Sequence, residues 1–420
     1  MGNHRVLRGR RNLFLGLCAL VLLGTYPATG WGAEARITAM GGGVKQITVA
    51  DEHGIWSLPS TLLDFGSWAA LHSAGRMDEP TLRDGRMGVH ISLTDAMALG
   101  VYAGTHRRPN LSIGGRFDPT AFGYAPFGDP SVVSEEQEAS AAEEEVTTVA
   151  KARPGYTHQM ALLFAMALSD TLRLGARFGV WLDGNDSGAL VDDPLVIDAG
   201  LGCSAELFGG DVSMGVGVKS GVGRTVGDVR LSRELAVDVT LRGQWKTKKG
   251  HQAIPYVHTV YTTPLGDEHP DGTARAAVLM VSVGSDLRLS LGDHVTVQPG
   301  LGITYAREVV RWQSDGNDVN TDVVAPYYNI AVDVGVTDWL SVRLGGSQEF
   351  QMIKVDHGEG VVTSTSDVVH RVTTGLGWTF PGGLVLDMQL ATGWGRRGPA
   401  IITGDRSTSV DGSVTLSMGW

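Results

Sequence analysis

The stretch "TLRLGARFGVWL", residues 171–182, alternates apolar residues with arginine and glycine. One parity holds only apolar residues, namely Leu172, Leu174, Ala176, Phe178 and Val180, and the other holds Arg173, Gly175, Arg177 and Gly179. Because successive side chains of a β-strand point to opposite faces, the pattern predicts a strand with one apolar face. The stretch is longer than the average soluble strand of about 5 to 6 residues, and it reaches the about 9 to 11 residues that a tilted strand needs to cross a bilayer. It therefore predicts a membrane-spanning strand.

The same alternation recurs along the chain, as in "IDAGLGCSAEL" (197–207) and "ELAVDVTLRGQW" (234–245). A barrel strand shows only half of its residues to lipid, so a mean hydropathy of +0.01 is compatible with a membrane barrel. The pattern predicts about sixteen strands, near 64–73, 85–93, 97–104, 157–168, 171–182, 195–208, 211–221, 232–246, 251–262, 275–290, 294–312, 323–336, 338–353, 367–380, 383–394 and 407–420. Sixteen is even, as in single-chain bacterial barrels, and fourteen stays open as the alternative count.

The connections between these strands alternate between short and long. The short ones are rich in turn-forming residues, as at 93–96, 168–171, 208–211, 291–294, 336–339 and 380–383. The long ones are 183–193, 264–272, 313–322, 357–366 and the partly acidic 105–156. This asymmetry is typical of outer-membrane barrels, with short periplasmic turns and long extracellular loops. The sequence thus predicts one all-β domain over 64–420, an antiparallel up-and-down transmembrane β-barrel in the bacterial outer membrane.

Residues 1–35 have the pattern of a secretory signal peptide. Four arginines precede the apolar run from Leu13 to Gly24, and small residues follow, with cleavage expected after Ala35. Cleavage would leave Cys203 as the single cysteine, so no intramolecular disulfide is expected. Removing four arginines and one glutamate would change the formal net charge from −11 to −14, which argues against nucleic acid as a partner.

The chain ends on "VTLSMGW", in which Val414, Leu416, Met418 and Trp420 share one parity. The last strand must pair with the first to close a barrel, because an open sheet edge in lipid leaves backbone groups unsatisfied. The ending resembles the C-terminal recognition signal of bacterial outer-membrane barrels, and the resemblance implies the barrel assembly machinery as a partner. Aromatic residues near strand ends are expected to form interfacial girdles, namely Trp181, Trp245, Tyr261, Trp312, Tyr327, Tyr328, Trp339, Trp378, Phe380 and Trp394.

The segment before the barrel, residues 36–63, contains "MGGG" (40–43), then Asp51, then "SLPSTLL" (57–63). This order resembles the N-terminal region of the long-chain fatty-acid transporter superfamily, although its Asn-Pro-Ala is replaced here by Leu58-Pro59-Ser60. The resemblance implies a periplasmic segment that folds back into the lumen as a plug, and it implies hydrophobic solutes such as fatty acids.

The inward parity carries glycines and charges of both signs, which argues against an apolar tunnel. The expected lumen-lining charges are Arg173, Arg177, Asp198, Glu206, Lys219, Asp238, Arg242, Asp286, Arg288, Asp333, Arg343, Arg371 and Asp387. Charged walls set the selectivity of pores, but the same charges also support a wall when they pair across strands, and both interpretations stay open. The sequence favours a channel or transporter for passive or gated passage of small solutes. A closed barrel with a structural, surface or assembly role is the alternative.

Motifs of catalysis are absent from the sequence, which has no G-x-S-x-G, H-E-x-x-H or P-loop pattern. We therefore expect neither an enzyme nor a cofactor or metal site. The expected partners are outer-membrane lipid, lipopolysaccharide, the assembly machinery and a small-molecule solute.

Overall fold

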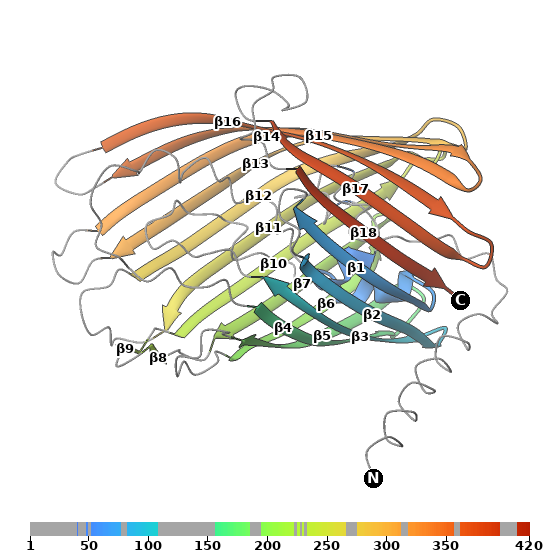
Figure 1. The fold of residues 1–420 in the computed structure, drawn as a ribbon, viewed down its shortest axis with the longest axis horizontal. Helices are drawn as coiled ribbons and strands as arrows, with labels where there is room; N and C mark the ends of the chain where they lie inside the picture. The colour runs from blue at the N-terminus through green and yellow to red at the C-terminus, as the bar shows by residue number, and fades with distance from the viewer. Residues whose placement is uncertain are drawn as a thin grey trace, which may run out of the picture.

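The structure is a computed structural model that describes residues 40, 48, 52–76, 82–107, 156–184, 195–221, 225–226, 229–230, 233–265, 275–311, 318–356, 362–394 and 410–420. Sixteen of its strands form one closed barrel (Figure 1). The expected signal peptide and the acidic part of the 105–156 loop lie outside the described residues.

Two short 3-10 helices, η1 (Glu52–Trp56) and η2 (Pro59–Asp64), precede the barrel. The barrel strands are β1 (Trp68–Arg76), β2 (Leu82–Thr94), β3 (Met97–Arg107), β4 (Tyr156–Ala167), β5 (Leu172–Gly184), β6 (Leu195–Leu207), β7 (Gly210–Gly221), β10 (Arg233–Lys246), β11 (Gln252–Leu265), β12 (Arg275–Ser290), β13 (Val295–Arg311), β14 (Asp318–Thr337), β15 (Leu340–Asp356), β16 (Val362–Thr379), β17 (Leu384–Trp394) and β18 (Val410–Gly419). The pair β8 (Thr225–Val226) and β9 (Val229–Arg230) forms a separate small hairpin between β7 and β10.

Each barrel strand pairs in antiparallel fashion with its neighbours along the chain, and β1 closes the ring on β18. The seam runs from Trp68 opposite Gly419 to Arg76 opposite Asp411. Closure removes the free sheet edges that lipid would not tolerate. The predicted up-and-down barrel of sixteen strands is confirmed, and the alternative of fourteen strands is wrong.

The two faces of the wall differ as the alternation predicted. On β5, Leu174 and Phe178 lie exposed on the outer surface, whereas Arg177 between them is buried on the inner side. The same contrast recurs on β6, where Leu201 is exposed and Asp198 is buried. An outward apolar band with polar residues inside is the arrangement of a transmembrane barrel, which places the chain in the bacterial outer membrane. No helix among the described residues is long and apolar enough to cross a membrane.

Several boundaries differ from the sequence prediction. The first strand begins at Trp68 rather than at 64, because Pro59–Asp64 forms a 3-10 helix with Pro59 at its start. Strands β14 and β16 start inside the predicted loops 313–322 and 357–366. In β14 the residues on the outward parity of this extension are polar, so the apolar alternation stops before the ladder of hydrogen bonds does.

The aromatic girdle prediction is wrong for Tyr327. Its side chain is buried on the inner face of β14, whereas the adjacent Tyr328 is exposed on the outer face. Trp339 and Phe380 are exposed in the short turns after β14 and β16. The side chains of Trp181, Trp312 and Trp394 lie outside the described set.

Candidate functional site

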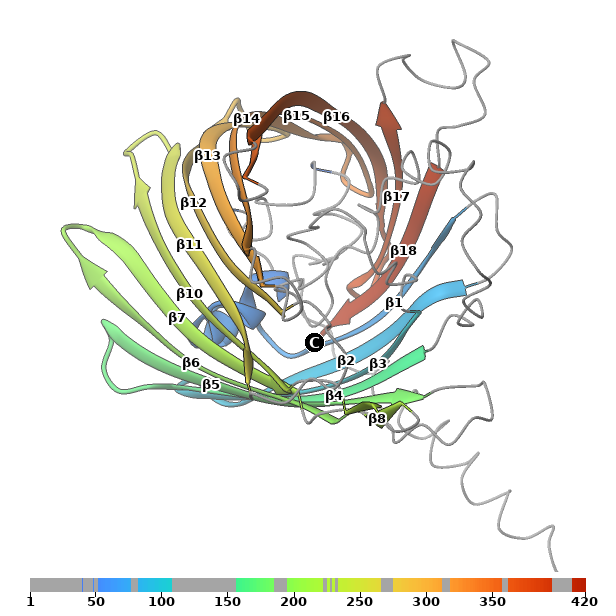
Figure 2. The same cartoon turned by 90° about the vertical axis from the view of Figure 1, so that its left-hand side faces the viewer.

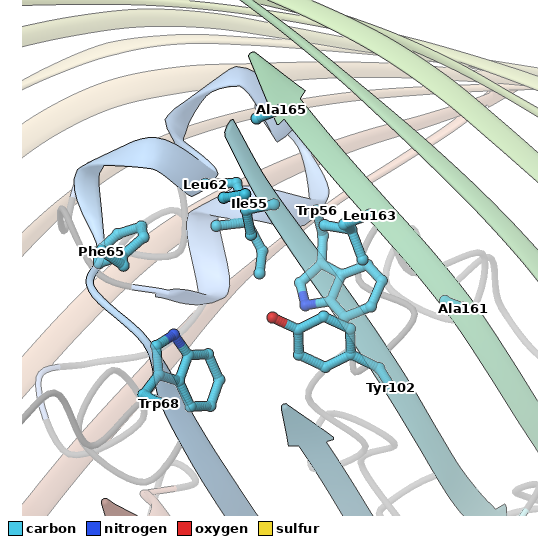
Figure 3. Close-up of a cluster of buried hydrophobic side chains, with 10 residues drawn as sticks. Ile55, Trp56, Leu62, Phe65, Trp68, Tyr102, Ala161, Leu163 and Ala165 are labelled. Atoms are coloured by element: carbon cyan, nitrogen blue, oxygen red, sulfur yellow. The ribbon is translucent and has the colours of Figure 1, made fainter. Parts of the chain in front are cut away.

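Residues 52–65, here called the inner segment, lie inside the ring of strands (Figure 2). Helix η2 contacts the inner wall from β3 to β7. Four apolar side chains of the segment, Ile55, Trp56, Leu62 and Phe65, form a buried cluster with wall residues Ala98, Tyr102, Ala161, Leu163 and Ala165 and with Trp68 (Figure 3). Trp56 meets the ring of Tyr102 edge-on, with 4.8 Å between the ring centroids. The segment is therefore held to the wall by a core of its own.

Three glycines allow this close approach. Gly175, Gly202 and Gly215 lie opposite one another on β5, β6 and β7, and we call them the glycine row. A Cβ on Gly175 would stand 2.5 Å from the carbonyl oxygen of Pro59, and one on Gly202 would stand 2.8 Å from the Pro59 ring. One on Gly215 would overlap the carbonyl oxygen of Ser57. The backbone of the inner segment thus lies directly on the backbone of the wall.

Polar groups attach the same stretch. The hydroxyls of Ser60 and Ser204 lie 2.6 Å apart, and the Ser204 hydroxyl donates to that of Ser213 at 2.9 Å. Asp64 forms an ion pair with Arg173, one of the expected lumen-lining residues. Both partners of this pair are partly exposed, so its contribution to stability is about 1 kcal/mol or less.

Two residues that precede the inner segment touch the wall elsewhere. The Thr48 hydroxyl donates to Asp286 Oδ2 at 2.6 Å and accepts from Gln298 Nε2 at 3.3 Å. Met40 packs on Ala331 of β14. The described residues of the N-terminal part, namely Met40, Thr48 and the inner segment, therefore contact the wall at β14, at β12 and β13, and at β3–β7.

A first group of predicted lumen charges converges on Arg177. Its guanidinium donates to Asp198 Oδ1 from Nε at 3.3 Å and from Nη2 at 3.1 Å, and Nη2 also lies 3.7 Å from Asp238 Oδ1. The side chain lies over Gly200, where a Cβ would stand 2.9 Å from Nε. All three charged residues are buried, so removing one partner would leave an uncompensated charge at a cost of about 3 to 5 kcal/mol.

A second group has the same construction on the other side of the barrel. Arg343 pairs with Asp387, and its Nε lies 3.5 Å from Asp333 Oδ2. Gly377 leaves the space that this pairing uses, since a Cβ there would stand 2.7 Å from Arg343 Nη2 and from Asp387 Oδ1. The pairing across strands favours a wall-supporting role for these charges.

Two of the remaining predicted residues join groups already described. Lys219 is half-buried opposite Asp198 in the β6–β7 ladder, and Arg242 is buried on β10, where the charge of Asp64 acts on it. Arg288 is half-buried, and Glu206 is exposed close to the turn after β6. The Arg371 side chain lies outside the described set. On the last strand, Val414 and Leu416 point outward, Met418 is half-buried, and the Trp420 amide donates to the Ser67 carbonyl at 3.0 Å across the seam. Within the described parts of the chain, no group of three or more His, Cys, Asp or Glu is placed to hold a metal ion.

A third polar group, on β11–β14, is not predicted by the sequence. Tyr256, Asp286, Gln298, Tyr327 and Asn329 are all buried on the inner face, and we call them the polar patch. Of these, only Asp286 was predicted as lumen-lining. Inward parity would have indicated the others, but their convergence depends on the register between four strands.

The outer surface carries a row of charged residues on β13, β14 and β15, in addition to its exposed aromatic residues. Arg307, Asp322 and Lys354 lie opposite one another on β13, β14 and β15. Arg307 Nε lies 3.9 Å from Asp322 Oδ1, to which the Tyr305 hydroxyl donates at 2.7 Å. The row lies toward the ends of these strands that carry the long connections.

No protein-family model matches the chain. No curated protein matches it either. Among solved structures, a bacterial polysaccharide outer membrane secretin is similar over 84% of this chain and 98% of its own, with 10% identity and a TM-score of 0.46. The P. putida toluene transporter TodX is similar over 89% and 95%, with 9% identity and a TM-score of 0.38. The CymD monoaromatic hydrocarbon channel is similar over 94% and 99%, with 12% identity and a TM-score of 0.36.

Proposed function

We propose that this chain is a gated outer-membrane channel for small solutes, in which residues 36–63 act as the plug. The observation that carries the proposal is the position of the inner segment, whose backbone lies on the glycine row inside the barrel. A ring of sixteen strands encloses more space than its own side chains fill, so a chain segment or water must occupy the middle.

The contacts of the inner segment indicate how firmly it is held. Its five large buried apolar side chains are Ile55, Trp56, Leu58, Leu62 and Phe65. Each contributes about 1.5 to 3 kcal/mol relative to exposure, which outweighs the partly exposed ion pair of Asp64 with Arg173. We therefore expect a closed resting state that opens only when a trigger offsets this burial. The two buried arginine groups maintain the wall and do not by themselves define a strict ion filter.

The test is single-channel recording in planar bilayers. The mature chain should conduct little, and deletion of most of residues 36–63 should raise the conductance, with weak ion preference because the lumen carries both signs of charge. Deletion within the 105–156 loop serves as the comparison, since this loop is the second candidate for occluding the lumen. If all variants fold and none conducts, the channel proposal fails, and the closed barrel with a surface or assembly role becomes the better account.

A disulfide gives a reversible version of this test. The Ser60 and Ser204 hydroxyls lie 2.6 Å apart, so cysteines at both positions, with Cys203 replaced by serine, should form a disulfide that fixes the inner segment to the wall. Any opening seen in the wild type should vanish under oxidising conditions and return on reduction. The single variants Ser60→Cys and Ser204→Cys control for the substitutions themselves.

The proposal includes partners at the membrane. We propose that the row of Arg307 and Lys354 contacts phosphate groups of lipopolysaccharide or phospholipid, because it combines exposed cations with nearby aromatic residues at the end of the lipid-facing band. Recognition of the C-terminal strand by the assembly machinery, an absence of nucleic-acid binding and an absence of enzymatic activity belong to the same proposal.

A further inference from the structure

We infer that the polar patch on β11–β14 is a binding site for a small polyhydroxylated solute, such as a polyol or a monosaccharide, and that Thr48 occupies it in the closed barrel. The competition between Thr48 and the solute, though not the binding itself, rests on the proposed channel function.

The contacts of Thr48 carry the first step. Its hydroxyl donates to a carboxylate oxygen of Asp286 and accepts from the amide of Gln298. The Gln298 amide also donates to the same carboxylate oxygen at 2.8 Å, so the two wall side chains hold each other in place. A carboxylate beside a carboxamide offers one acceptor and one donor, which is what a single alcohol group requires. Thr48 therefore stands where a solute hydroxyl would bind.

The second step is a pair of tyrosine hydroxyls next to this position. Tyr256, Gly284, Gly302 and Tyr327 form one row across β11–β14. Both tyrosine hydroxyls approach the point where a Cβ on Gly284 would stand, at 2.6 and 2.7 Å. Tyr256 and Tyr327 are only 3% and 9% exposed, and neither hydroxyl has a hydrogen-bond partner among the described residues. Buried polar groups are normally paired, so two converging unpaired hydroxyls point to a missing ligand.

The third step is the distance between the two tyrosine hydroxyls and the Asp286 carboxylate that Thr48 contacts. Asp286 and Asn329 lie in the next row toward the short turns, on either side of Gly300. A Cβ on Gly300 would stand 2.7 Å from Asn329 Oδ1, so this amide lies beside the Asp286 carboxylate. Rows two residues apart along a strand are separated by about 7 Å. A solute with hydroxyl groups at both ends would span that distance and reach both rows.

The order of the rows gives a direction. The tyrosine row lies nearer the predicted extracellular loops, and the Asp286 row lies nearer the short turns. A solute entering from outside would meet the tyrosine row first and would then compete with Thr48 for the Asp286–Gln298 pair. Displacing Thr48 would remove one of the attachments of the N-terminal part of the chain to the wall, which supplies a trigger for opening.

Equilibrium dialysis of radiolabelled sorbitol against the purified mature barrel tests the site without relying on conductance. Thr48→Val keeps the shape of the side chain and removes the competing hydroxyl, so it should raise the apparent affinity for sorbitol roughly tenfold, the value of a hydrogen bond to a charged group. Ser413→Ala is the matched control, because it removes a buried wall hydroxyl, which donates to Gln389 at 2.7 Å on β17–β18, outside both the polar patch and the contacts of the inner segment. It should leave sorbitol binding unchanged.

The tyrosine hydroxyls are tested in the Thr48→Val background. Tyr256→Phe and Tyr327→Phe retain the rings that cover the glycines, and each should weaken sorbitol binding by about two- to tenfold. The inference is overturned if sorbitol binds Thr48→Val no better than Ser413→Ala, or if the phenylalanine variants bind it as well as their parent. If sorbitol binds as expected while the plug deletion stays non-conducting, the site stands and the channel proposal fails. If the deletion conducts and sorbitol does not bind, the site fails and the channel stands.

Discussion

Replacing Gly175 with alanine should open the lumen, whereas the same change at Gly179 should not. Both glycines lie on the inner parity of β5, four residues apart. A Cβ on Gly175 would stand 2.5 Å from the Pro59 carbonyl oxygen and would approach two further backbone atoms of the segment even more closely. A Cβ on Gly179 would meet its nearest atom at 3.6 Å, which is an ordinary contact. The two variants therefore differ in one respect, the presence of the inner segment above the glycine.

The size of the effect follows from the geometry. Pro59 would have to move by about 1 Å or more to reach the about 3.5 Å at which non-bonded heavy atoms make contact. Strand β5 is held by hydrogen bonds to β4 and β6, whereas the inner segment belongs to no sheet, so the segment should move. Overpacking of this kind costs about 1 to 3 kcal/mol, which shifts the ratio of open to closed states by about 5- to 150-fold.

Two measurements check this expectation. The open probability of single channels should rise in Gly175→Ala and stay at the wild-type level in Gly179→Ala. In a background with Cys203 replaced by serine, a cysteine at Ser57 should react faster with a maleimide when residue 175 is alanine. Alanine is preferred over glycine in a strand by about 0.5 to 1 kcal/mol, so Gly179→Ala should leave the barrel equally or more stable. Equal open probability and equal labelling in two folded variants would refute the position assigned to the inner segment.

Three further outcomes are expected. Arg177→Ala should lower the free energy of unfolding by about 3 to 5 kcal/mol in denaturant titrations of the folded barrel, because it takes the guanidinium from buried Asp238 and leaves buried Asp198 with Lys219 alone, and Arg177→Lys should recover only part of the loss. Deleting Trp420 should reduce the amount of protein in outer-membrane fractions, and normal levels would show that the terminal aromatic is dispensable. A protease applied to intact cells should cut within 134–150 while tags at 93–96 or 208–211 stay shielded, and cutting only after permeabilisation would reverse the orientation.

The strand pattern was predictable because parity is a local property. The face on which a strand residue lies follows from the alternation of its neighbours in sequence. This alternation is sufficient to assign Leu174 to the outer face and Arg177 to the inner face. The same alternation explains why Tyr327 does not belong to the outer girdle. Adjacent residues of a strand point to opposite faces, so Tyr327 and Tyr328 could not both belong to an outer girdle. Proximity to a strand end therefore does not place an aromatic residue on the outer face unless its parity agrees.

The convergence of side chains was not predictable in the same way. The grouping of Arg177 with Asp198 and Asp238 depends on the stagger of four strands, and stagger is set by closure of the whole ring. The inner segment has no periodicity that would fix its position, because its two 3-10 helices are only five and six residues long. Thr48 meets Asp286 across 238 residues of chain, and no local pattern connects them.

Once the register of the strands is known, the inward glycines indicate which parts of the lumen wall are covered by other groups. Taken alone, they suggest a wider lumen, since they project no side chain. In the folded barrel that space is used: the inner segment lies on Gly175 and its row, Arg177 lies over Gly200, and tyrosine rings cover Gly284 and Gly302. These inward glycines therefore mark places where another group lies flat against the wall, whereas Gly179 has no such cover. The chemistry of the covering group then separates the cases. Where it is a flexible arginine, an added methyl group should be tolerated by a small shift of the side chain. Where it is the backbone of the inner segment, the same methyl group should displace the plug. The effect of alanine at each inward glycine should therefore identify the kind of group that covers that part of the lumen wall.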